Sequence, residues 1–63
     1  MNSYYIEVRH VDASDDSATD YMTEWQIKNA DSEREAMDAI TLAWLARGRA
    51  VTSQLVLETT KAI

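Results

Sequence analysis

The sequence predicts a small α+β domain of element order ββαβ: a three-stranded antiparallel sheet of order 2-1-3 with one helix packed on one face. Two alternating apolar and polar segments, a capped helical segment and a final alternating segment predict these elements. The helix returns the chain along the sheet, so the last strand runs parallel to the second. Placing the last strand beside the first needs only a short connection. We expect the 63 residues to form one domain, residues 1–63.

The first predicted strand covers residues 4–11, YYIEVRHV. Aromatic and β-branched residues suit a pleated surface, and here they alternate at period two. Tyr4, Ile6 and Val8 are expected on one face, and the intervening residues, beginning with Tyr5, on the other.

The second predicted strand covers residues 21–28, YMTEWQIK. Four residues are expected to face the helix: Tyr21, Thr23, Trp25 and Ile27. The other four are expected to face outward: Met22, Glu24, Gln26 and Lys28. Trp25 should then pack in the core together with Trp44 of the helix.

The predicted helix covers residues 32–47. Ser32 and Glu35 have the spacing of a capping box, in which each side chain satisfies a backbone N–H that the helix leaves unpaired. Gly48, the only glycine of the chain, stands where a left-handed residue would end the helix.

The third predicted strand covers residues 50–58. Its core side is expected to carry Val51, Ser53, Leu55 and Leu57. The sheet face without a helix would stay open, and four apolar residues are expected to point outward there: Tyr5, Val11, Met22 and Val56.

Composition excludes several function classes. The chain has no cysteine, so disulfides and thiolate metal sites are absent, and its single histidine makes a zinc site uncommon. A net charge of −5 disfavours direct binding of nucleic acid and favours a basic protein surface. No segment resembles a membrane span or a leader, so we expect a cytoplasmic protein. A chain this short buries only about 60% of its unfolded surface, so self-association or a permanent partner is expected.

An acidic connection, DASDDSATD at residues 12–20, allows three interpretations. Its alternating positions resemble a calcium loop, but Ser17 replaces the required glycine and Thr23 the required glutamate. A solvated connection and an acidic surface that contacts a partner are the alternatives. The partner-contacting candidates here are Asp12, Asp15, Asp16, Asp20 and Glu24.

The helix supplies the other candidates for partner binding. Asp31, Glu33 and Glu35 suit the positive end of the helix dipole, whereas Asp38 lies beyond the first turn. These acids and the loop could together imitate a row of phosphates. Leu42 and Leu45 are expected to point away from the sheet beside Asp38 and to form a small apolar contact patch. The candidates on this element are therefore Asp31, Glu35, Asp38, Leu42 and Leu45.

Catalysis is not expected. His10 is interpreted as a surface or edge histidine, because no nucleophile or glycine-rich phosphate loop accompanies it. No cofactor and no metal are assigned.

The chain resembles small phage-encoded inhibitor proteins of the anti-CRISPR type. The similar features are a tiny acidic chain without cysteine, an early strand (YYIEV), a strand ending in WQIKNA, a capped SEREA helix and a last strand. The resemblance implies a non-catalytic protein in the host cytoplasm that blocks a nucleic-acid channel or a subunit interface of a larger complex, with its carboxylates standing in for phosphates.

Two hypotheses follow. In the first, the protein inhibits or modulates a nucleic-acid-handling complex through an acidic face and a few exposed apolar residues. In the second, it is a homodimeric assembly module that buries its open sheet face, or Leu42 and Leu45, against a second copy.

Overall fold

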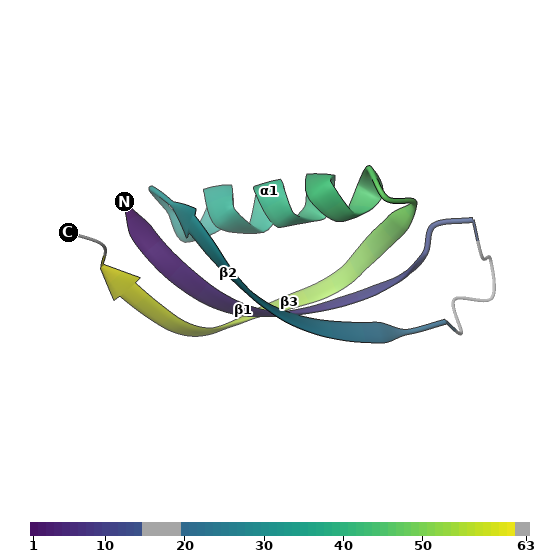
Figure 1. The fold of residues 1–63 in the computed structure, drawn as a ribbon, viewed down its shortest axis with the longest axis horizontal. Coiled ribbons are helices and arrows are strands. Elements are labelled where there is room, and N and C mark those ends of the chain that lie inside the picture. Colours follow the sequence, from purple (N-terminus) through teal and green to yellow (C-terminus); the bar gives the residue numbers. More distant parts are fainter. Residues whose placement is uncertain (15–19, 62–63) are drawn as a thin grey trace.

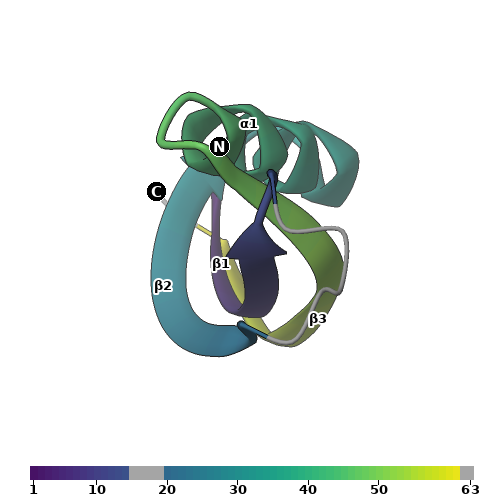
Figure 2. The same ribbon diagram turned by 90° about the vertical axis from the view of Figure 1, so that its right-hand side faces the viewer.

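The computed structural model describes residues 1–14 and 20–61, which form a three-stranded antiparallel sheet under one helix (Figure 1). The elements are β1 (Asn2–Asp12), β2 (Met22–Ala30), α1 (Glu33–Leu45) and β3 (Arg49–Lys61). The strand order is β2-β1-β3, which confirms the predicted α+β class and topology. Figure 2 shows α1 above the sheet, with β2 and β3 curving past β1 on either side.

The core lies between β1 and α1. Period-two alternation places Tyr4, Ile6 and Val8 of β1 on the face that the helix covers, where they meet Ala36 and Ile40. The two helix residues are four positions apart and therefore lie on one side of α1. Among residues 1–14 and 20–61, only a few large side chains are fully buried, so each of them contributes a large share of the hydrophobic stabilisation.

The helix begins as the sequence predicts. The Ser32 hydroxyl accepts a hydrogen bond from the Glu35 backbone N–H at 3.2 Å, and the Glu35 carboxylate accepts one from the Asp31 N–H at 3.3 Å. α1 ends at Leu45, two residues before the predicted end, and a turn leads to Gly48 at φ 77°. Within the described residues, no helix is long and apolar enough to cross a membrane.

The two faces of β2 are the reverse of the prediction. Trp25 and Ile27, expected in the core, are 57% and 70% exposed, whereas Gln26 is half-buried and accepts a hydrogen bond from the Trp44 indole N–H at 3.1 Å. β2 is an edge strand beside the helix, so long polar side chains can cover apolar neighbours there while their ends reach water. Trp44 packs against the core as predicted; Trp25 does not.

The prediction for β3 is also wrong beyond Val51. Leu55 and Leu57 are exposed, and Val56, expected outside, packs against the core. The register shift at Thr52 causes the difference at Leu55 and Val56, because the pairing with β1 skips Thr52; the pairing also skips Leu57, which follows them. Each shift adds one residue to β3 and reverses the faces that follow it. Val11 of β1, also expected outside, is buried.

Candidate functional site

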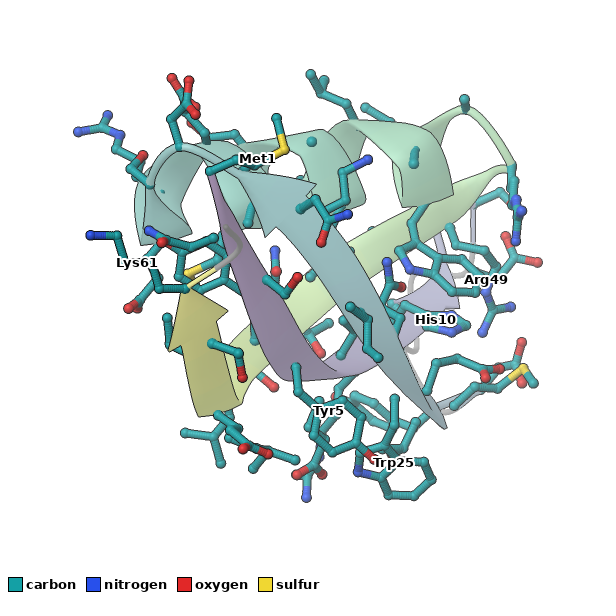
Figure 3. The ribbon with its side chains drawn as sticks, turned by 60° about the vertical axis from the view of Figure 1, so that its left-hand side comes forward. Met1, Tyr5, His10, Trp25, Arg49 and Lys61 are labelled. Atoms are coloured by element: carbon teal, nitrogen blue, oxygen red, sulfur yellow. The ribbon has the colours of Figure 1, made fainter. Side chains whose placement is uncertain are left out.

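The sheet face opposite α1, here called the helix-free face, carries large apolar side chains from all three strands. Tyr5 of β1 pairs with Ile27 of β2, and Glu7 of β1 pairs with Trp25 on one side and Leu55 of β3 on the other. Residues paired directly across strands share a face of the sheet. Figure 3 shows Tyr5 and Trp25 together beneath the sheet, on the side away from the helix.

An ion pair lies at the centre of this face. The Arg9 Nε is 3.9 Å from the Glu7 carboxylate, and the Glu7 side chain is only 23% exposed because Trp25 and Leu55 flank it. Arg9 in turn pairs with Thr23 and Ser53, two small residues. Large side chains therefore surround Glu7, and small ones surround Arg9.

Grooves open on the helix-free face beside these residues. One groove of about 360 Å³ is lined by Arg9, Thr23 and Ser53, together with Tyr21 and Thr52. Another, of about 230 Å³, lies between Tyr5 and Ile27 at the other end of the face. The face thus has projecting aromatic and aliphatic side chains, and beside them it has grooves.

A second cluster surrounds His10, which is buried and not at the surface as predicted. The imidazole is 1% exposed and stacks on the Trp44 ring, with ring centroids 3.9 Å apart. Its Nδ1 accepts a hydrogen bond from the Arg49 Nε at 3.0 Å, so the neutral ring carries its proton on Nε2. Nε2 is buried and has no hydrogen-bond partner among the described residues. Because the ring is covered, no substrate can contact it in this structure.

Arg49 connects this cluster to the start of β2. Its guanidinium donates to the Asp20 carboxylate at 2.7 Å and to the backbone carbonyls of Asp20 and His10. Burial, and next the positive charge of Arg49, lower the pKa of His10, against smaller opposing effects of Glu24 and Asp20. No motif in the sequence marks this cluster, because its members are far apart along the chain.

The predicted acidic candidates that the structure describes do not form one face. Asp12 and Asp20 lie at the end of the molecule where Gly48 leads into β3, while Asp31 and Glu35 lie at the start of α1, at the opposite end (Figure 1). Glu24 is half-buried on β2, and Asp38 is exposed on α1. Asp15 and Asp16 are outside the described residues.

Several of these acids already have partners within the chain. Two hydrogen bonds from Ser14 to the Asp12 carboxylate lower the pKa of Asp12. Asp20 is paired with Arg49, and Asp38 lies 3.9 Å from the Arg34 Nε. Among residues 1–14 and 20–61, no three potential ligands gather as a metal ion would need.

The apolar candidates on the helix are placed as predicted. Leu42 and Leu45 are 66% and 54% exposed and project from α1 away from the sheet. They are fewer than the exposed apolar side chains of the helix-free face, some of which were predicted to lie in the core.

Comparison of the chain with family models, with curated proteins and with solved structures gives no match. The resemblance to phage-encoded inhibitors therefore stays a prediction.

Proposed function

We propose that this chain is a non-catalytic protein-binding module whose helix-free face is the binding surface. One observation carries the proposal: each edge strand half-buries a glutamine on its helix side and exposes large apolar residues on the other side, although β3 also turns Val51 and Val56 toward the helix. On β2 the glutamine is Gln26, against Trp25 and Ile27, and on β3 it is Gln54, against Leu55. An isolated domain would gain stability from the opposite arrangement, because buried apolar area contributes about 25 cal/mol per Å².

The composition of the helix-free face fits a binding role. Tryptophan, tyrosine and arginine are the residues most enriched where protein interfaces derive their binding energy, and this face presents Trp25, Tyr5 and Arg9 together. Contiguous exposed apolar side chains on a soluble protein often mark a site of protein interaction. The small core explains why a partner would also stabilise the fold.

A second candidate function follows from the helix. Asp31, just before α1, and Asp38 on α1 have 75% and 71% of their side chains exposed, and Leu42 and Leu45 follow Asp38 on the same side of the helix. A basic surface of a nucleic-acid-handling complex could bind there, which is the inhibitor hypothesis. Such binding would weaken strongly as salt rises, because exposed charges are screened.

Site-specific photo-crosslinking in the cells that produce the protein tests the proposal. A benzoyl-phenylalanine in place of Tyr5 keeps an aromatic ring on the helix-free face, and the same group in place of Leu42 probes the helix. We expect covalent adducts from position 5, because a partner covers that face, and few from position 42.

The positions of the adducts decide between the candidates. Adducts from position 42 alone would favour the helix surface and the inhibitor hypothesis. The absence of any adduct from position 5, in a variant whose circular dichroism matches that of the unmodified protein, would refute the proposed function.

A further inference from the structure

We infer that the partner on the helix-free face is a second copy of this chain, an inference that rests on the proposed function. The face is self-complementary in charge and in size, as a symmetric dimer interface must be. Two features show this: the order of charges along β1, and the alternation of large and small residues on β2 and β3.

Charge complementarity selects one arrangement of the two copies. In such a dimer the helix-free faces of the two copies stack on each other. One possible two-fold axis lies midway between the two sheets, runs perpendicular to the strands and passes over Val8. It stacks β1 antiparallel on β1 and places Glu7 opposite Arg9 of the second copy, twice. A two-fold axis along the strands would instead place Glu7 opposite Glu7. Stacked sheets lie about 10 Å apart, a gap that these two long side chains can span together.

At the levels of Glu7 and Arg9, the same axis matches large residues with small ones. Trp25 and Leu55 are level with Glu7, whereas Thr23 and Ser53 are level with Arg9. The rotation brings the residues level with Glu7 in one copy over those level with Arg9 in the other. Trp25 then lies opposite Thr23, and Leu55 lies opposite Ser53, of the second copy. Thr23 and Ser53 line the groove of about 360 Å³, so the hollow lies where the projecting side chains of the second copy would arrive.

The charge of the face also favours a second copy over a basic protein. The chain carries −5, but the ion pair at the centre of the face is balanced, and Glu58 beside Tyr5 is the further acid on the described part of this face. A basic partner would be drawn to the exposed acids elsewhere. A standard interface buries about 800 Å² per partner. That is less than a fifth of the 4397 Å² surface, so one sheet face can supply it.

Sedimentation of the purified full chain with charge-reversed variants tests the inference. The unmodified protein should pass from monomer to dimer as concentration rises. Glu7→Arg and Arg9→Glu should each weaken the dimer at least about tenfold, because each places like charges opposite one another at two points. Circular dichroism at the same concentrations verifies that both variants are folded.

Mixing the two variants provides the decisive result. An equimolar mixture should form a mixed dimer about as tightly as the unmodified protein, because both opposed pairs become complementary again. Both variants keep a net negative charge, so general attraction cannot produce this rescue. If Glu7 and Arg9 interacted only with each other within one chain, mixing the two variants would not restore the dimer either.

Other outcomes overturn the inference. A chain that stays monomeric at millimolar concentration, or a mixture that fails to dimerise, contradicts it. If position 5 then crosslinks to a different protein, the protein-binding function stands and only the second copy is refuted. If position 5 crosslinks to nothing, both fall.

Discussion

Replacing Ile40 by alanine is expected to remove a large share of the free energy of unfolding of the domain. Ile40 is 1% exposed and is the large helix residue that meets Ile6 and Val8 of β1. Removing such a side chain typically costs about 2–5 kcal/mol. A domain of this length has roughly 3–9 kcal/mol of stability in total at about 0.05–0.15 kcal/mol per residue. Urea unfolding followed by circular dichroism at a fixed protein concentration measures the loss.

Leu42 supplies the matched control on the same helix. Leu42→Ala removes a similar side chain that is 66% exposed and is expected to change stability by no more than about 0.5 kcal/mol. Equal losses for the two variants would show that the core does not lie where the structure places it.

Acid is expected to destabilise the fold as pH falls below about 6.5, the ordinary pKa of histidine. Burial and Arg49 lower the pKa of His10 in the folded state, so the unfolded chain binds a proton first. The stability from His10 is complete above the unfolded pKa and decreases as pH falls toward the folded pKa. One proton accounts for at most about 1.4 kcal/mol per pH unit.

Protonation would also break a specific contact. Nδ1 accepts the hydrogen bond from Arg49, and a protonated Nδ1 would present a second donor to that guanidinium. His10→Gln removes the only imidazole of the chain and should flatten the stability profile just below pH 6.5. Thermal unfolding between pH 5 and pH 8 compares the two proteins, and an unchanged slope in the variant would exclude His10 as the cause.

The topology could be predicted because local patterns determine it. The alternation of β1, the capping residues Ser32 and Glu35, and Gly48 each indicate their element without reference to the rest of the chain. Short connections then leave few arrangements of three strands and one helix. These features depend on backbone periodicity, hydrogen bonding and steric limits, all of which are readable in one sequence.

The faces of the edge strands could not be predicted by the same reasoning. On β2, the rule that apolar residues face the core assigned Trp25 inward, but the rule assumes that the chain acts alone. If a partner covers the other face of the sheet, apolar residues on that face are buried as well, and the rule no longer indicates which face points toward the helix. On β3, the extra residues at Thr52 and Leu57 change the register, and no glycine or proline marks either position.

The candidate site was therefore predicted only in part. Leu42 and Leu45 are exposed as expected, and an open sheet face exists, but sequence reasoning left most of its apolar residues in the core. The acids looked like one surface because they are close in the first part of the chain. In space Asp20 and Asp31 lie toward opposite ends of a molecule 42 Å long, because β2 separates them (Figure 1).

NMR spectra of the isotope-labelled protein over a dilution series test whether self-association buries the helix-free face. The signals of Tyr5, Trp25 and Leu55 are expected to shift together as concentration rises, while those of Leu42 and Leu45 stay constant. Concentration-dependent shifts confined to the helix leucines, or no shift at any residue up to millimolar concentration, would contradict the claim.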